Sequence, residues 1–168
     1  MDQWKSQQAI IFLTERMSKV KLSKPSIIHG IRAGLIAENW CVDEDAILAS
    51  YLHDILEDTD TTYDDMVAAF GGKVAEAVRA NTKFGTNGEK KDIGQIIDSC
   101  LRVGEYAVIA KAADILDNIR NYKGYHAQEK WERERESLEK KREVFLDRCA
   151  AYVDRNFYKD MVSAIFSK

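Results

Sequence analysis

Apolar residues in this chain recur every three or four positions rather than alternating, which is the spacing of amphipathic helices. One proline, Pro25, and nine scattered glycines give few interruptions. The pattern predicts an all-α fold. Helices are expected over Ala9–Val20, Pro25–Trp40, Asp43–Asp58, Thr62–Phe70, Val74–Ala80, Asp92–Leu101 and Glu105–Tyr122.

Short polar residues mark several of these boundaries. Asp43 can cap the third helix, because its carboxylate accepts hydrogen bonds from amides that have no partner in the first turn. Thr61 or Thr62 can cap the fourth in the same way. Gly71 and Gly72 then end that helix.

Two segments are strongly polar. Residues 81–91 contain two glycines, two asparagines and three lysines, which predicts an exposed loop. Residues 129–143 are almost entirely charged, yet Trp131, Leu138 and Phe145 are seven positions apart, which predicts a solvated helix with a thin docking stripe. Since no linker or internal repeat interrupts the pattern, we expect a single-domain helical bundle over residues 1–168.

Composition narrows the function classes. The 168 residues include 25 Lys and Arg against 28 Asp and Glu, a net charge of -3, so no strongly basic field is present to hold a long phosphate backbone. We therefore expect no nucleic-acid partner. No apolar run reaches the roughly 18 residues of a membrane span, and the first residues do not resemble a secretory leader, so we expect a cytoplasmic protein without a membrane role.

The three cysteines do not form a motif. Cys41, Cys100 and Cys149 are odd in number and far apart, which argues against a disulfide framework and a thiolate zinc site. We interpret them as reduced thiols in the core.

A cluster of reactive side chains lies at the end of the predicted third helix. His53, Asp54, Glu57 and Asp58 occupy six positions, and in a continuous helix His53 shares a face with Glu57 and Asp54 shares a face with Asp58. Three carboxylates this close repel one another unless a cation neutralises them. The alternative is a row of surface carboxylates near a helix end.

Two further residues extend this cluster. His29 lies among apolar positions, and Asp114 lies on an apolar helix with Asn118 one turn later. Taken singly, His29 could be a hydrogen-bonded core histidine, and Asp114 could pair with Lys111 or Arg120. Together, imidazoles and carboxylates without thiolate indicate a site for manganese, iron or zinc.

These motifs resemble those of a known family. LHDxxEDTxxT, followed by FG and then KxADxxxN, is similar to the HD-domain metal phosphohydrolases, and more narrowly to the hydrolase domain of RelA/SpoT-type alarmone enzymes and the small alarmone hydrolases. The resemblance extends from about residue 1 to beyond residue 150. It implies a stand-alone hydrolase that removes the 3′-pyrophosphate from guanosine (p)ppGpp, with one Mn2+ per chain.

The resemblance also implies residue roles. The metal ligands fall on His29, His53, Asp54 and Asp114, the catalytic acids on Glu57 and Asp58, and the contact with the sugar and phosphate region on Asn118. This agrees with general chemistry. A metal ion acidifies a bound water and polarises a phosphoryl oxygen, and Glu57 can orient or deprotonate that water.

The chain departs from the family pattern on the nucleobase side. Gly30 replaces the usual proline after the first histidine, no GxPY segment precedes it, and ADRLHN reads ADILDN, with Ile115 and Asp117. Substrate contacts are predicted for Lys21, Lys24 and Arg32, which could supply the missing cation, and for Lys83, which with Lys90 and Lys91 could clamp phosphates from the 81–91 loop or simply be solvated.

Two alternatives therefore remain open. One is an HD-type phosphohydrolase acting on another nucleotide, such as an adenosine alarmone, a nucleoside phosphate or NADPH. The other is a non-catalytic helical regulatory module. The oligomeric state is left open.

Overall fold

The computed structural model describes residues 3–21, 25–40, 43–85, 87–125 and 131–166. Within these ranges the regular elements are helices. In addition, one isolated antiparallel β-bridge pairs Phe84 with Lys90. The all-α prediction is confirmed. None of the described helices combines the length and the apolar character needed to cross a membrane.

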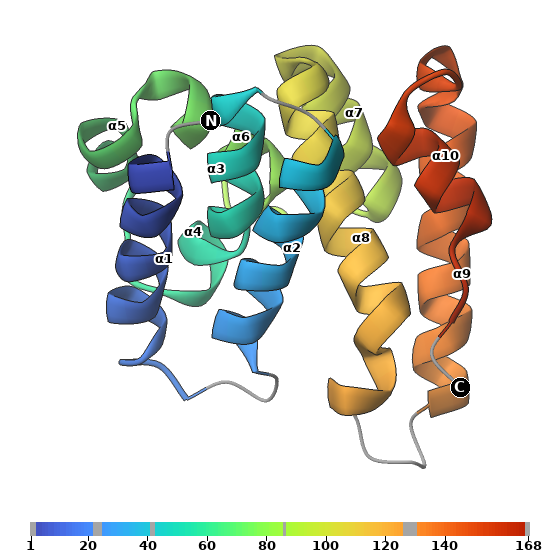
Figure 1. Cartoon of the computed structure of the whole chain (residues 1–168), viewed down its shortest axis with the longest axis horizontal. Coiled ribbons are helices and arrows are strands. Elements are labelled where there is room, and N and C mark those ends of the chain that lie inside the picture. Colours follow the sequence, from blue (N-terminus) through green and yellow to red (C-terminus); the bar gives the residue numbers. More distant parts are fainter. Residues whose placement is uncertain (1–2, 22–24, 41–42, 86, 126–130, 167–168) are drawn as a thin grey trace.

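The helices follow one another along the chain (Figure 1). They are α1 (Gln3–Met17), α2 (Ser26–Trp40), α3 (Glu44–Leu52), α4 (Ile55–Asp58), α5 (Tyr63–Phe70), α6 (Gly72–Asn81), α7 (Ile93–Val103), α8 (Glu105–Tyr125), α9 (Trp131–Arg148) and α10 (Asn156–Ser163), with a 3-10 turn at Ala150–Tyr152.

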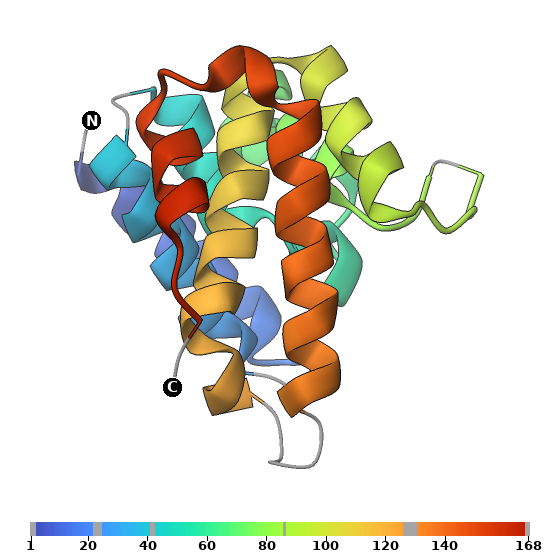
Figure 2. The same cartoon turned by 90° about the vertical axis from the view of Figure 1, so that its right-hand side faces the viewer.

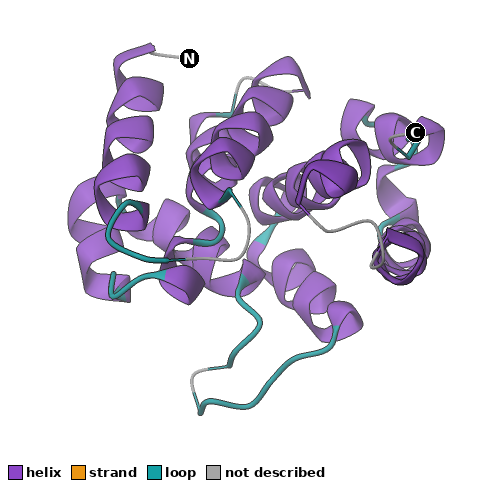
Figure 3. Cartoon of the chain, turned by 90° about the horizontal axis from the view of Figure 1, so that it is seen from below, coloured by secondary structure: helices purple, strands orange, loops and turns teal. Residues whose placement is uncertain are grey.

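Helix α8 is the organising element. It packs against α2, α3, α6 and α7 on one side and against α9 and α10 on the other. Figure 2 shows α9 running alongside α8, and Figure 3 shows the 82–92 loop extending away from the packed helices. The most buried face of α8, around Leu116 and Ile119, therefore lies at the centre of the core.

The predicted caps are confirmed. Asp43 accepts a hydrogen bond from the Ala46 amide at 3.0 Å and starts α3. Thr62, rather than Thr61, starts α5 and exchanges hydrogen bonds with Asp65 in a capping box. Gly71 ends α5 at φ +86°, a backbone conformation that glycine adopts without strain.

The single helix predicted over Asp43–Asp58 is wrong. Helix α3 ends at Leu52, a turn carries His53 and Asp54, and α4 is only one turn long. Nδ1 of His53 donates to the Ser50 carbonyl at 2.8 Å, an acceptor that the Asp54 amide would use in an uninterrupted helix. This side-chain hydrogen bond accompanies the break in the helix. Because His53 and Glu57 lie on opposite sides of the break, their predicted shared face does not apply.

The predictions for the polar segments and the cysteines are confirmed where the structure describes them, and one further helix is present. The 81–91 segment is largely a loop, and α9 forms with Leu138 and Phe145 buried as expected. Helix α10 was not predicted. Cys100 and Cys149 are buried free thiols, whereas Cys41 lies outside the described residues, as does the side chain of Trp131.

Two glycines allow α2 and α3 to approach closely. A Cβ atom on Gly34 would lie 2.3 Å from ring atoms of Tyr51, and one on Gly30 would lie 2.8 Å from the Tyr51 carbonyl oxygen. Neither position has room for a side chain unless its neighbours move. The close approach brings His29 on α2 to the end of α3, where His53 lies.

Candidate metal centre

Four predicted ligands converge from three parts of the fold. His29 comes from α2, His53 and Asp54 from the turn between α3 and α4, and Asp114 from α8. The two imidazole Nε2 atoms are 3.0 Å apart, and Oδ1 of Asp114 is 3.2 Å from Nε2 of His29 and 3.6 Å from Nε2 of His53. Oδ2 of Asp54 is 3.4 Å from Nε2 of His53 and 3.8 Å from Nε2 of His29.

The far side of each imidazole fixes its tautomer. Nδ1 of His53 faces the Ser50 carbonyl, which can only accept, and Nδ1 of His29 faces Oδ2 of Asp117 at 2.7 Å. Both Nδ1 atoms therefore carry hydrogen, and in the neutral rings both Nε2 lone pairs point into the centre. Two lone pairs at this distance repel unless a proton or a cation lies between them. With two carboxylates beside them, the donor set fits a divalent transition metal.

Neighbouring charges and hydrogen bonds shift the pKa values of His29 and Asp114. Burial lowers the pKa of His29, but hydrogen bonds to Asp114 and Asp117 outweigh it and raise that pKa to about 9. Burial alone would raise the pKa of Asp114, yet the Lys111 ammonium, 2.8 Å from Oδ2, and the nearby histidines hold it well below its usual value. Asp114 is therefore a carboxylate that favours cations.

Asp117 is a site residue that the sequence reasoning missed. It is fully buried, accepts from Nδ1 of His29, and pairs with Nε of Arg32 at 2.7 Å and with Nδ2 of Asn121 at 2.9 Å. In the sequence it stood out only as a replacement for a family histidine. Its position three residues after Asp114 on an apolar helix was the signal that could have placed it toward the same centre.

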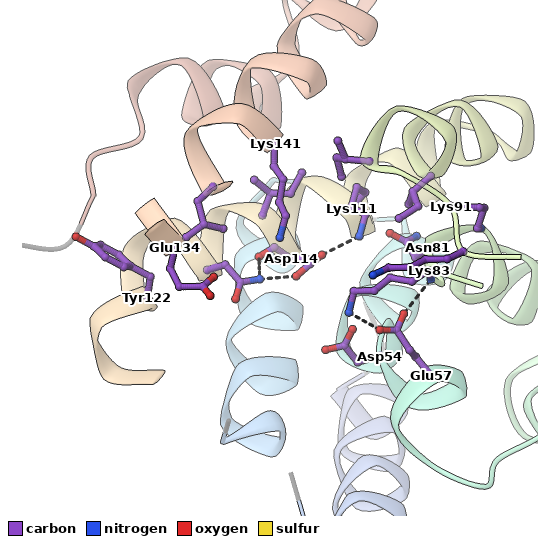
Figure 4. Close-up of a pocket in the computed structure, with 16 residues that line it drawn as sticks. Asp54, Glu57, Asn81, Lys83, Lys91, Lys111, Asp114, Tyr122, Glu134 and Lys141 are labelled. Atoms are coloured by element: carbon purple, nitrogen blue, oxygen red, sulfur yellow. Dashed lines mark hydrogen bonds and ion pairs between the residues drawn. The ribbon is translucent and has the colours of Figure 1, made fainter. Parts of the chain in front are cut away.

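A cavity of about 310 Å3 opens beside the ligands (Figure 4). Asp54, Glu57 and Asp114 line it, together with lysines from the 82–92 loop, from α8 and from α9. Glu57 accepts a hydrogen bond from the Lys83 amide at 2.9 Å and forms an ion pair with the Lys83 ammonium. Asp58 is half-buried and is not among the described residues that line the cavity.

The remaining predicted contacts divide into two groups. Asn118 lines the cavity, and its Nδ2 donates to Oδ1 of Asp114 at 2.6 Å; Lys83, Lys90 and Lys91 also line it. Lys21 is exposed and borders a different hollow between α1 and α2, while Arg32 is engaged with Asp117 outside the cavity lining. Lys24 lies outside the described residues.

Comparison with known proteins finds relatives whose names refer to ppGpp hydrolysis. A protein of Aquifex aeolicus named guanosine-3′,5′-bis(diphosphate) 3′-pyrophosphohydrolase is 30% identical over 138 residues, which are 79% of this chain and 20% of that protein. The protein of the same name, MESH1, from Danio rerio is 32% identical over 99 residues, 58% of this chain and 55% of that one. The chain thus spans about a fifth of the bacterial relative and about half of the fish relative.

A solved structure supports the fold. This structure, described as "A metazoan ortholog of SpoT hydrolyzes ppGpp and plays a role in starvation responses", matches with a TM-score of 0.70 at 22% identity over 95% of this chain and 92% of that one. The helical arrangement of the two proteins is therefore the same.

The family assignment rests on a direct match. The model of the HD domain family aligns with residues 26–119, more than half of the chain. That range begins at the start of α2 and contains all four converging ligands. The chain belongs to the HD domain family.

Proposed function

We propose that this protein is a Mn2+-dependent hydrolase that removes the 3′-pyrophosphate from guanosine (p)ppGpp. The observation that carries the proposal is that the four-ligand centre opens onto a cavity lined by five lysines, Lys83, Lys90, Lys91, Lys111 and Lys141. Such a cavity suits a substrate with several phosphate groups. The names of the relatives point to the same substrate.

The chain provides ligands for one divalent ion. His29, His53, Asp54 and Asp114 would hold it, with the imidazoles oriented by Asp117 and the Ser50 carbonyl. When bound, the ion supplies Lewis-acid stabilisation of phosphate charge and makes water more acidic. Manganese is proposed because the resemblance to the alarmone hydrolases implies Mn2+, and a donor set of imidazole and carboxylate without thiolate is compatible with this ion.

In this proposal Glu57 handles the proton of the attacking water. Its carboxylate lines the cavity with Asp54 and is held by Lys83. In the hydrolysis, the water oxygen bonds to the phosphorus attached to the ribose 3′ oxygen, and that oxygen leaves as a hydroxyl group. Glu57 takes a proton from the water and the leaving 3′ oxygen takes up one proton, from Glu57 or from solvent, so ppGpp and water give GDP and pyrophosphate. Asp58 is not among the described residues that line the cavity, and its catalytic role remains a prediction.

Asn118 and the lysines act on the substrate rather than on the water. Nδ2 of Asn118 donates to the carbonyl and to Oδ1 of Asp114 at the cavity wall, which leaves Oδ1 of Asn118 to accept a hydrogen bond from a sugar hydroxyl group. Lys83 and Lys91 extend from the opposite side of the cavity and reduce the charge of the phosphates.

A nucleotide assay tests the proposal. Protein loaded with stoichiometric Mn2+ should convert ppGpp to GDP and pyrophosphate, as followed by anion-exchange chromatography. A chelator and His53→Ala should each abolish the reaction. Intact ppGpp after incubation with fully metal-loaded protein would overturn the assignment.

A second candidate is hydrolysis of a different nucleotide. Lys21 and Arg32, two of the residues predicted to supply a cation near the base, do not line the cavity. Guanine selectivity therefore lacks the support that the sequence suggested. The same assay should include adenosine alarmones, nucleoside phosphates and NADPH, and the fastest substrate decides between the two candidates.

A further inference from the structure

Lys141 occupies an unexpected place on α9. Most of this helix is charged and exposed, but Leu138 and Phe145 are 5% and 0% exposed and attach it to the core. Lys141 lies three residues after Leu138 and four before Phe145, so it shares their face. A position between two docking residues would ordinarily carry an apolar side chain.

The Lys141 side chain enters the cavity beside the metal centre. It lines the cavity together with Leu138 and Glu134 of the same helix, and Figure 4 shows its ammonium directed toward Asp114. Burial lowers the pKa of this ammonium, and the negative charge of Asp114 partly offsets that effect. A cation in this position gains free energy when an anion binds next to it.

Two of the other four cavity lysines already have carboxylate partners, and a third, Lys91, donates to the Ala80 carbonyl at 3.3 Å. Lys83 pairs with Glu57, and Lys111 pairs with Asp114 at 2.8 Å. Among the residues that the structure describes, no hydrogen bond or ion pair involves the Lys141 ammonium. Since Lys111 already neutralises part of the Asp114 charge, the charge of Lys141 is left for a ligand.

The direction of Lys141 identifies which part of the ligand it meets. Asp114 is one of the four converging ligands, so an ammonium directed toward it lies next to the phosphorus under attack, not across the ribose from it. The group nearest to that phosphorus on the side away from the ribose is the second phosphate of the same diphosphate. This reasoning rests on the proposed function.

We propose that Lys141 binds the outer phosphate of the diphosphate group that the enzyme releases. Together with the metal centre it forms a pyrophosphate-binding subsite, in which one phosphate lies at the ligands and the other at Lys141. Lys141 thereby favours substrates with a 3′-diphosphate over those with a 3′-monophosphate.

The test compares binding of inorganic pyrophosphate and inorganic phosphate to the Mn2+-loaded protein, with Mn2+ kept in excess of both anions. Lys141→Met should raise the dissociation constant of pyrophosphate by about tenfold or more and leave that of phosphate nearly unchanged. Lys141→Arg should retain most of the pyrophosphate affinity. Lys140→Met is the matched control, because it removes the same charge from an exposed neighbour on the same helix.

Three results would overturn the inference. They are unchanged pyrophosphate binding in Lys141→Met, an equal loss for phosphate and pyrophosphate, and an equal effect of Lys140→Met. Circular dichroism and metal content establish that the variants fold. If Lys141→Met does not fold, Lys141→Gln replaces it in the same comparison.

The readout is independent of which nucleotide is hydrolysed. If ppGpp is not a substrate but Lys141→Met still loses pyrophosphate selectively, only the proposed function fails. If ppGpp is hydrolysed and pyrophosphate binding does not depend on Lys141, only this inference fails.

Discussion

His29 and His53 show how a buried imidazole is prepared for a metal by the group on its far side. One ring donates to a carboxylate and the other to a backbone carbonyl, so both present Nε2 to the same point. Hydrogen bonds of this kind fix the tautomer and raise the basicity of the ligand atom. Asp117 therefore affects the metal through His29 although it does not face the centre itself.

Asp117→Asn should weaken Mn2+ binding by about 10- to 100-fold, because an amide accepts a weaker hydrogen bond from Nδ1 of His29 and brings no negative charge. Competition with a metal-binding dye measures the change. The exposed Asp64→Asn serves as the control and should bind Mn2+ as the parent does. Equal affinity of the Asp117 variant and the parent would show that the contact with His29 does not tune the ligand.

Glu57→Gln should lower kcat by a factor on the order of 10² or more, because the amide cannot accept the proton of water. The metal content and the affinity for nucleotide should stay close to those of the parent, since Glu57 lines the cavity without joining the four converging ligands. Turnover is measured under saturating substrate. A variant with undiminished kcat would remove Glu57 from the chemical step.

Single residues also mark the limit of sequence reasoning. The four converging positions could be named from their residue types and motifs, whereas the pairing of Arg32 with Asp117 was not indicated by the sequence. Helical spacing tells which face a residue occupies on its own helix. It does not tell which side chain faces it from another helix, so the contact between α2 and α8 could not be foreseen.

At the level of elements, the turn between α3 and α4 determines how the site is built. Apolar spacing continues through Ile55 and Leu56, so the sequence predicts one helix to Asp58. In a continuous helix His53 and Asp54 would diverge by about 100°. The break allows both side chains to turn toward the same point, and periodicity alone carries no signal of it.

The close crossing of α2 and α3 gives a prediction at this level. Gly34→Ala should lower the free energy of unfolding by about 1–3 kcal/mol, because the added Cβ meets the Tyr51 ring and the ring is held by its hydrogen bond to Glu38. Urea denaturation measures the change. Gly72→Ala is the control, since a Cβ there meets nothing within 4 Å. Equal stability of the two variants would contradict the tight crossing.

At the scale of the whole molecule, the centre joins α2, the α3–α4 turn and α8 into one unit. These parts are distant in sequence, and each contributes at least one predicted ligand. The helical class and most helix positions followed from periodicity and caps. The mutual placement of the helices came only from the structure, because it depends on long-range packing around α8.

Binding of a metal ion should therefore stabilise the entire fold. With free Mn2+ at 100 times its dissociation constant, the gain is about 2.7 kcal/mol, and a chelator should lower the melting temperature accordingly. Asp54→Ala should keep its helical circular dichroism spectrum but lose stoichiometric metal and the response to chelation. A variant that retains one Mn2+ per chain would show that Asp54 is not a ligand.

The spacing of the ligands along the chain also sets the order in which the centre can be completed during synthesis. His29 and His53 are 24 positions apart and leave the ribosome well before α8. A nascent chain that has only these early residues lacks both Asp114 and the buried carboxylate that orients His29. If these residues hold the ion, all four can coordinate it only after α8 has docked, so complete coordination would report a core that has already formed.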